Sequence, residues 1–248
     1  MKKLISLLLC CGVGFLMSCQ QQTTVDDVVN MMTEANGGAE ALAALTDAVI
    51  IGEMTVHVSE GPMTLPTTMK AKRPNKIRMD VYGPEGSIVR SYGYDGTAGW
   101  IMEDGQRKDM LEAQLKGFES MATTWFDGYL NYQDKGFTLE LLADEVVDEQ
   151  NYRVLQVTDK HGNVKKCYIN PGTLFIERES GNMGITGEWK PMVMTFKDYK
   201  MVDGIAWFHH WTWHNATGEM TWEMTVKEVK HNTGVDDAVF MAEAMSEK

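Results

Sequence analysis

Apolar and polar residues alternate along most of the chain, which is typical of strands in an antiparallel sheet with one buried face. The first three alternating segments cover residues 54–58, 63–71 and 77–81, and the third follows a break at Pro74. Further strand-like segments cover residues 100–102, 137–141, 153–159, 164–169, 174–179, 192–196, 205–214 and 220–226. Short turn sequences rich in Gly, Asn and Asp separate them, so we expect hairpins.

Helical spacing replaces the alternation in four places. Apolar residues recur at helical intervals in residues 25–32, after which Gly37 and Gly38 end the helix. A second short helix is expected at residues 39–45, a third at 111–125 and a last one from residue 236 to about 245. Each helix has one apolar stripe that needs a surface to pack on. The pattern predicts an α+β fold with helices over one face of an antiparallel sheet.

The N-terminus has the features of a secretory signal peptide. Lys2 and Lys3 precede an apolar run that is too short to span a bilayer and ends in small residues. Leu16-Met17-Ser18-Cys19 resembles the bacterial lipobox, in which cleavage leaves a lipidated cysteine; the alternative is an ordinary signal peptide with an incidental cysteine. We therefore expect a signal peptide at residues 1–18, a lipidated tether at 19–24 with Cys19 as the lipidation site, and one domain at 25–248. Gln20, by resemblance to known sorting rules, favours the outer membrane.

Composition and cysteine usage narrow the partners. The 248-residue chain has a formal net charge of −12. An acidic chain is repelled by phosphate groups, which argues against nucleic acid as a partner. Outside the expected signal peptide only Cys19 and Cys167 remain, so lipidation of Cys19 leaves no intramolecular disulfide. Cys167 lies in an alternating segment, and we interpret it as an inert half-buried thiol.

The segment Trp207-Phe-His-His-Trp-Thr-Trp-His214 contains the residues most suggestive of a metal site. On a helix, His210 and His214 could share a zinc ion, but aromatic residues and Thr favour a strand. On a strand these two residues lie roughly 13 Å apart, too far for one metal, and His209 faces the side opposite His210. A third ligand from a neighbouring strand leaves a metal-dependent enzyme as a minority alternative. The sequence has no nucleophile elbow, zinc-protease motif or phosphate-binding loop, so we predict no catalytic residue, metal or cofactor.

Nineteen methionines occur, many at inward strand positions. Flexible thioether side chains suit either an adaptable ligand-binding surface or an irregular core. Alternation places Arg78 on the opposite, solvent-facing side of its strand. The residues expected to face the covering helices and line a cavity are Met54, Met69, Ile77, Met79, Val81, Met194, Phe196, Met220, Trp222 and Met224.

Five segments occur in an order that resembles the outer-membrane lipoprotein-sorting (LolA/LolB-like) superfamily. They cover residues 36–45, 72–78, 94–100, 169–174 and 198–205. The resemblance implies a strongly curved antiparallel sheet, an unclosed half-barrel, with helices covering its concave face and a hydrophobic cavity for acyl chains. The chain departs from characterised members. The soluble carrier lacks a lipobox, the anchored acceptor has an exposed apolar loop residue that residues 82–86 do not supply, and the chain is too short for the second domain of related stress sensors.

These observations lead to one functional hypothesis and two alternatives. The hypothesis is a membrane-anchored periplasmic protein that binds lipid or lipoprotein acyl chains without catalysis, with a role in lipoprotein sorting or envelope maintenance. The first alternative is an envelope interaction or stress-sensing protein with a vestigial cavity. The second is the metal-dependent enzyme built around His209, His210 and His214. The expected partners are the membrane, through the N-terminal lipid, and acyl chains or a lipidated protein.

Overall fold

The computed structural model describes residues 23–59, 61–103, 105–184 and 187–241. The expected signal peptide, Cys19 and most of the tether lie outside the described residues. The first half contains α1 (Val25–Ala35), α2 (Ala39–Ala43), β1 (Asp47–Val58), β2 (Gly61–Lys72), β3 (Lys76–Tyr82), β4 (Ile88–Tyr94), β5 (Gly99–Glu103), β6 (Gln106–Asp109) and α3 (Glu112–Thr124). The second half contains β7 (Thr138–Leu141), β8 (Glu145–Val147), β9 (Gln150–Thr158), β10 (Val164–Ile169), β11 (Ile176–Met183), β12 (Lys190–Lys197), β13 (Lys200–Val202), β14 (Ile205–Trp207), β15 (His210–His214), β16 (Met220–His231) and the 3₁₀ helix η1 (Asp237–Phe240).

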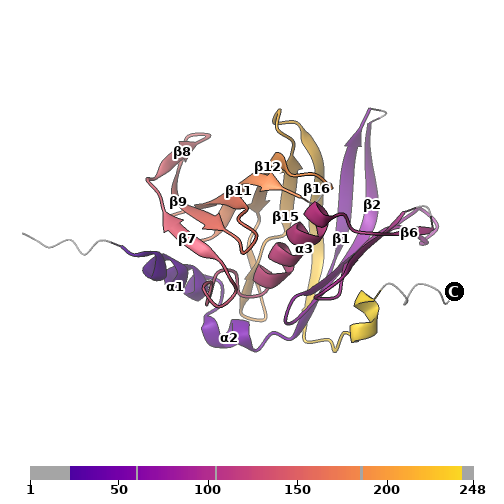
Figure 1. Cartoon of the computed structure of the whole chain (residues 1–248), viewed down its shortest axis with the longest axis horizontal. Helices are drawn as coiled ribbons and strands as arrows, with labels where there is room; N and C mark the ends of the chain where they lie inside the picture. The colour runs from indigo at the N-terminus through magenta and orange to yellow at the C-terminus, as the bar shows by residue number, and fades with distance from the viewer. Residues whose placement is uncertain (1–22, 60, 104, 185–186, 242–248) are drawn as a thin grey trace, which may run out of the picture.

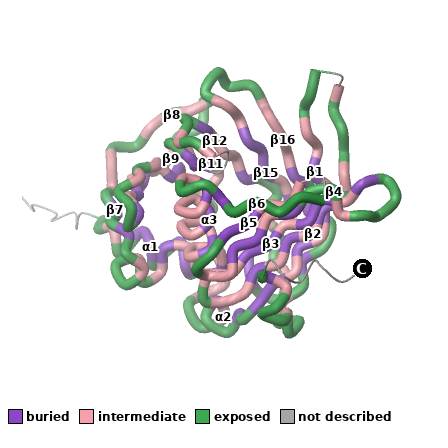
Figure 2. Tube along the Cα trace, turned by 45° about the vertical axis from the view of Figure 1, so that its right-hand side comes forward, coloured by how far each residue is buried: buried purple, intermediate pink, exposed green. Residues whose placement is uncertain are grey.

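One antiparallel sheet dominates the molecule. Its strands follow the order β6-β5-β4-β3-β2-β1-β16-β15-β12-β11-β10-β9-β7, with β8 paired to β9. The two ends of this order, β6 and β7, do not pair with each other, so the sheet curves without closing into a barrel (Figures 1 and 2). The expected α+β fold with an unclosed, curved antiparallel sheet is confirmed.

Bulges contribute to the bending of the sheet. The register of β1 against β16 shifts between Ile51 and Gly52. A side chain at Gly52 would place its Cβ 2.3 Å from the carbonyl oxygen of Thr225, so only glycine fits this close approach. Similar shifts occur in the β3–β4, β10–β11 and β15–β16 pairs. Each bulge increases the local twist of its strand, which favours a curved sheet over a flat one.

The helices begin where the sequence pattern predicts. At the start of α1, the Thr24 hydroxyl accepts a hydrogen bond from the Asp27 amide, and the Asp27 carboxylate accepts one from the Thr24 amide. At the start of α3, the Gln114 side chain accepts a hydrogen bond from the Leu111 amide. In Figure 1, α3 lies in front of the sheet, with α1 and α2 beside it toward the N-terminal end. Among the described residues, no helix has the length and apolar character needed to cross a bilayer.

The buried side chains form two clusters. The larger joins α2 and α3 to the concave face of β1–β4, β12 and β14–β16, and includes Ile50, Ile77 and Met224. The smaller joins α1 to the segment after α3 and to β7, β9 and β10, and includes Val28 and Leu155. Helices therefore cover the concave face at two places.

The convex face of β3 is covered by the C-terminal segment, which makes the expected exposure of Arg78 wrong. The Arg78 side chain is only 6% exposed and pairs with the Asp80 carboxylate at 2.8 Å. Its guanidinium also donates to the Val239 carbonyl oxygen at 2.7 Å and lies over the Trp100 ring. Phe240, fully buried, completes this cover, and its carbonyl oxygen accepts from the Trp100 indole. Alternation separates the two faces of a strand, but it does not reveal a distant segment that packs on the outer one.

The helix expected from residue 236 to 245 is present only as the short η1, and residues 242–248 lie outside the described part of the chain. The Asp236 carboxylate accepts from the Ala238 amide at 2.9 Å and starts this single turn. After Phe240 enters the core, Met241 has an extended backbone conformation. Burial of one aromatic side chain, and not a helical stripe, fixes this segment.

Asp47 provides a pH-dependent link between the start of β1 and the end of β16. It is 2% exposed, and its carboxylate accepts hydrogen bonds from the amide and hydroxyl of Thr233 and from the Gly234 amide. Burial raises the pKa of Asp47, but the hydrogen bonds together lower it by more than burial raises it. The pKa of Asp47 therefore lies below its usual value of 3.8. The resulting stabilisation is present above that value and is lost as the pH falls through the lowered pKa.

We expect Asp47→Asn to reduce the free energy of unfolding at pH 7 by about 1–3 kcal/mol, because the amide replaces a charged acceptor with a mixed donor and acceptor. Urea denaturation at several pH values between 7 and 3 should show a smaller loss of stability with acid for the variant than for the wild type. The exposed Glu228 on β16 supplies a control, Glu228→Gln, for which we expect a change within about 0.5 kcal/mol. Equal acid sensitivity of Asp47→Asn and the wild type would contradict this assignment.

Candidate functional site

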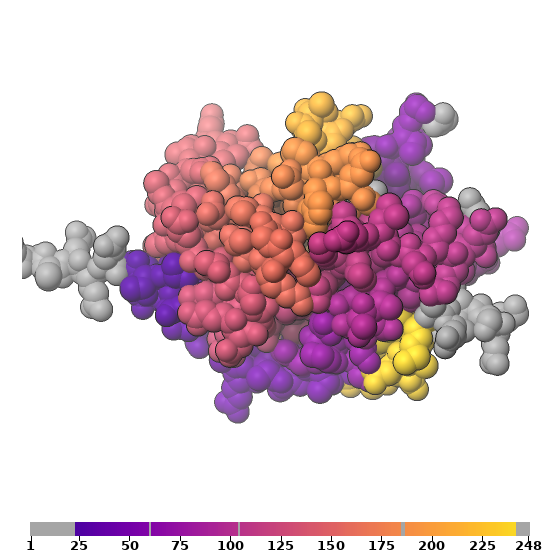
Figure 3. Space-filling view, viewed as in Figure 1, coloured from indigo at the N-terminus to yellow at the C-terminus, as the bar shows by residue number. Residues whose placement is uncertain are grey.

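A cavity of about 310 Å³ lies between the helices and the concave face of the sheet. α1 and α3 contribute one side, and β2 and β3 contribute Met69, Ile77 and Met79. Further lining residues come from α2, from residues 125–129, and from β9–β12 and β14–β16. On the face shown in Figure 3, α3 and the segment around residues 160–184 lie side by side. The volume is within the roughly 300–1,000 Å³ of small-molecule pockets. Its walls are mainly apolar and aromatic.

The structure brings six of the ten residues expected at the cavity to its wall. These are Met69, Ile77, Met79, Met194, Phe196 and Trp222. Met54, Val81 and Met224 point to the same side but are packed within the larger apolar cluster. Met220, at the start of β16, is half-buried and lies outside the lining. The cavity is therefore displaced toward the second half of the sheet, away from β1.

Aromatic residues that the sequence analysis did not assign to the cavity form much of its wall. They are Phe118, Trp125, Phe126, Tyr129, Trp189, Tyr199, Trp207, Phe208, Trp211 and Trp213. Trp213 stacks on Trp222 with ring centroids 5.0 Å apart, and Phe208 meets Trp211 edge-on at 5.0 Å. The signal was present in the sequence, because Trp211 and Trp213 alternate within one strand.

The histidines make structural contacts. Residues His210–His214 form β15, as the aromatic composition predicted. His210 Nε2 lies 2.8 Å from a carboxylate oxygen of Glu223, and His214 Nε2 lies 2.8 Å from the Thr212 hydroxyl. His209 Nδ1 lies 3.0 Å from the carbonyl oxygen of Trp207. Within the described part of the chain, no three His, Cys, Asp or Glu side chains are placed to hold a metal ion.

One polar cluster lies in the mainly apolar wall. Lys165 Nζ donates to both carboxylate oxygens of Glu179, each at 2.9 Å, and lies 5.9 Å from the Tyr129 ring centre. Burial lowers the pKa of Lys165, but the Glu179 carboxylate raises it more, so the ammonium stays charged. Cys167 is fully buried beside them, 3.4 Å from the Tyr129 hydroxyl. Burial raises the pKa of the Cys167 thiol, which keeps it protonated and unreactive.

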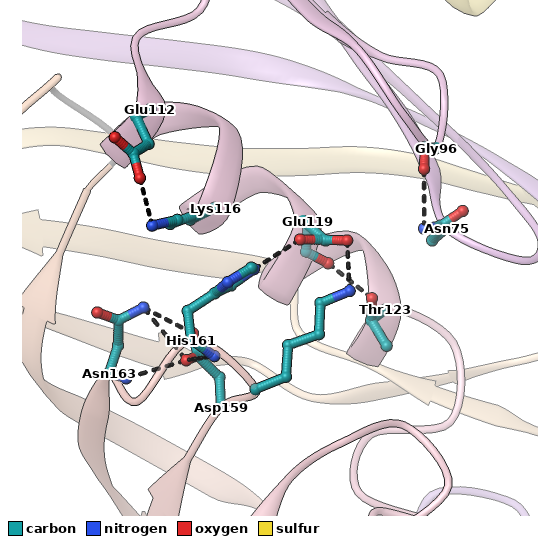
Figure 4. A network of polar contacts seen from close by, with 10 residues as sticks. Asn75, Gly96, Glu112, Lys116, Glu119, Thr123, Asp159, His161 and Asn163 are labelled. Atoms are coloured by element: carbon teal, nitrogen blue, oxygen red, sulfur yellow. Dashed lines mark hydrogen bonds and ion pairs between the residues drawn. The ribbon is translucent and has the colours of Figure 1, made fainter.

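A second polar network joins α3 to the turn between β9 and β10 (Figure 4). The Glu119 carboxylate accepts from Lys160 Nζ at 2.6 Å and contacts His161 Nε2 at 2.7 Å. Burial raises the pKa of Glu119, but the contacts with Lys160 and His161 lower it more. The Asp159 carboxylate accepts from the amides of His161 and Asn163 and thereby shapes the turn. Because α3 and this turn both contribute to the cavity wall, the network fixes their separation.

A third contact set holds α2 and the segment after α3. Arg73 donates to the carbonyl oxygens of Leu45 at 2.6 Å and Leu42 at 2.8 Å, near the end of α2. Its guanidinium also pairs with Asp127 at 3.1 Å. Asp127 is one of the cavity-lining residues. One side chain from the β2–β3 turn thus positions two parts of the covering layer.

No family model matches the sequence, and no curated protein matches it. Several solved structures match the fold at low sequence identity. An outer membrane lipoprotein-sorting protein domain from Vibrio parahaemolyticus has a TM-score of 0.61 at 14% identity, with 88% of this chain and 96% of that chain covered. A DUF1329 family protein from Desulfovibrio piger has a TM-score of 0.62 at 14% identity, with 89% and 98% covered.

A LolA superfamily protein from Nitrosomonas europaea has a TM-score of 0.58 at 12% identity, with 88% of this chain and 97% of that chain covered. These similarities extend over nearly the full length of the matched structures, in agreement with the family resemblance of the sequence. At such identities they establish the architecture and leave the subtype open. The chain has a LolA-like fold.

Proposed function

We propose that this protein is a membrane-anchored, non-enzymatic protein of the bacterial envelope that binds acyl chains in its cavity. The observation that carries the proposal is the cavity itself, a mainly apolar space of about 310 Å³ between the helices and the concave face of the sheet. Flexible methionines and flat aromatic rings line it, and such side chains adapt to chains of varied shape. The lipoprotein-sorting domain and the LolA superfamily protein with the same fold support this assignment by analogy.

In this proposal the N-terminus supplies the anchor. Residues 1–18 are removed as a signal peptide, Cys19 receives the lipid, residues 19–24 form the tether and residues 25–248 form the binding domain. Several acyl chains on one residue hold a protein firmly at a membrane, whereas one chain alone binds reversibly. The protein then works at the outer membrane, facing the periplasm, in lipoprotein sorting or envelope maintenance.

The binding proposal is tested on purified full-length chain carrying Cys19→Ala, which has no acyl chain of its own. We expect solvent extracts to contain acyl lipid in near-stoichiometric amount when analysed by mass spectrometry. A fluorescent acyl probe should bind saturably once this lipid is removed. If no lipid copurifies and the probe does not bind to folded protein, the proposal fails and a protein-interaction function takes its place.

The anchoring proposal predicts that Cys19→Ala abolishes incorporation of a labelled fatty acid in cells. Because the anchor and the cleavage site are lost together, the variant should accumulate as uncleaved precursor or reach the wrong fraction. Labelled palmitate followed by gel analysis measures the modification, and membrane fractionation measures the location. Cys167→Ala is the control and should be labelled at the wild-type level. Labelling of Cys19→Ala at that level would disprove the assignment.

A further inference from the structure

The charged groups around the cavity restrict the chemistry of its occupant, provided that the proposed binding function holds. Among the described residues that line it, four have charged side chains, namely Asp127, Asp159, Lys165 and Glu179. Lys165 is thus the one cation in the described lining. Asp127 pairs with Arg73 and with Lys135, neither of which lines the cavity, so its own negative charge is compensated from outside the lining.

Lys165 is already neutralised by Glu179, which occupies two of its three ammonium protons. Asp159, close enough to raise the pKa of Lys165, adds a further negative charge near the pair. The whole chain is also acidic, with a formal net charge of −12. An anionic headgroup in this cavity would therefore lose its hydration without gaining an unpaired cation.

Hydrogen-bonding groups nevertheless face the interior. The side chains of Lys165 and Glu179 remain 23% and 12% exposed although protein surrounds them, because both lie on the cavity wall. Within the described part of the chain, the ammonium group donates hydrogen bonds to Glu179 alone, which leaves its third proton for a ligand. A bare hydrocarbon would leave this donor unused.

Four tryptophans add further donors. The indole nitrogens of Trp125, Trp207, Trp211 and Trp213 are buried without a hydrogen-bond partner among the described residues, and all four residues line the cavity. These N–H groups are enclosed within the wall, and a ligand would reach them only through a rotation of the rings. An indole is an uncharged donor, and a carbonyl oxygen is a suitable acceptor for it. Buried donors without acceptors are rare in folded proteins.

We propose that the cavity selects an uncharged acyl ester, with its ester oxygens at the Lys165–Glu179 pair and its chains against the apolar wall. Acylglycerols and the diacylglyceryl group of a lipidated protein both have this chemistry. Free fatty acids and lipids with anionic headgroups do not. The cavity is thereby a site with a polar end and an apolar end, which fixes the orientation of the ligand.

Competition between two chain-matched ligands tests the selection. Full-length chain carrying Cys19→Ala is titrated at pH 8 with 1-monolauroylglycerol and with laurate, each below its micelle concentration, against a fluorescent acyl probe. We expect the glyceride to bind at least about tenfold more tightly than the ionised acid. Emission from the tryptophans should change on glyceride binding, since their indole groups gain acceptors.

The Glu179→Gln variant separates the proposed preference for an uncharged ester from the general desolvation cost of a carboxylate. It frees the Lys165 charge, so affinity for laurate should rise and the preference for the glyceride should shrink by about tenfold. The matched control is Glu145→Gln, which breaks the exposed ion pair with Lys166 on the other face of β10 and should leave the preference unchanged. Lys165→Gln with Glu179→Gln, an uncharged pair, should keep the wild-type preference and remains informative if Glu179→Gln does not fold.

Each outcome decides the matter. Equal affinities for the two ligands in the wild type, or the same ratio in wild type and folded Glu179→Gln, would overturn the ester selection while acyl binding stands. Binding of neither ligand would overturn the proposed function and this inference with it.

An S-diacylglyceryl-cysteine peptide identifies the source of the ester. Tighter binding of the peptide than of the glyceride assigns a lipidated protein, the reverse order assigns a free glyceride, and both support the inference.

Discussion

Asp80→Ala is expected to lower the free energy of unfolding by about 3–5 kcal/mol, because it leaves the buried Arg78 guanidinium without its carboxylate. Arg78 and Asp80 have side chains only 6% and 2% exposed, and the Arg78 Nε lies 2.8 and 3.0 Å from the two Asp80 oxygens. Asp80 also accepts from the Ser91 hydroxyl and lies 3.9 Å from Lys70 Nζ. Urea denaturation followed by circular dichroism measures the loss.

The control for this variant is Arg90→Ala on the adjacent strand. Arg90 pairs with Glu103 at 3.4 Å, but both side chains are more than two-fifths exposed, at 45% and 43%. An exposed pair of this kind contributes about 0–1 kcal/mol. If Asp80→Ala and Arg90→Ala cost similar amounts, the cover formed by η1 over β3 does not persist in solution. Hydrogen exchange of the amides around Val239 would then be fast as well.

Met79→Asp is expected to reduce acyl-probe affinity by about tenfold or more, because a carboxylate in the cavity must lose its hydration when an apolar chain enters. Met79 is half-buried and lines the cavity from β3, so water reaches the new carboxylate in the empty protein. The effect on stability should therefore be smaller than the effect on binding. Displacement of a fluorescent acyl probe gives the affinity, and thermal unfolding of the same samples gives the stability.

Met201→Asp is the matched substitution at an exposed site. Met201 lies on β13, is 59% exposed and does not line the cavity. We expect it to leave probe affinity and melting temperature near their wild-type values. Loss of binding in Met201→Asp as well as Met79→Asp would mean that net charge governs binding, and not the cavity. Unchanged binding in folded Met79→Asp would place the acyl site elsewhere.

The sequence pattern predicted the strands well where one face of each strand is apolar. Thr67, Met69 and Ala71 of β2 alternate with half-buried polar neighbours, and the structure places them in the buried layer. The same rule failed for Arg78, because η1, more than 150 residues later, packs on the outer face of β3. Packing between segments so far apart depends on the assembled fold, and the alternation of apolar and polar residues within one strand does not predict it.

The cavity was harder to predict than the sheet. Alternation identified which side of each strand is apolar, but it did not distinguish residues packed in the core, such as Met224, from residues that face empty space, such as Met194. That distinction depends on where the helices fail to touch the sheet. One signal was available. Lys165 has the same strand parity as Cys167 and Ile169, both fully buried, so a charge occupies the apolar face of β10.

α1 is the first described helix of the chain and also forms part of the cavity wall, through Val29 and Met32. If Cys19 is the anchor, the chain from Cys19 to Val25 reaches at most about 20 Å when fully extended. Such a short tether would hold the binding site next to the bilayer surface and prevent the domain from crossing the periplasm. The protein would then exchange ligands with its own membrane or with a carrier that reaches this membrane, and would not itself carry ligands between membranes.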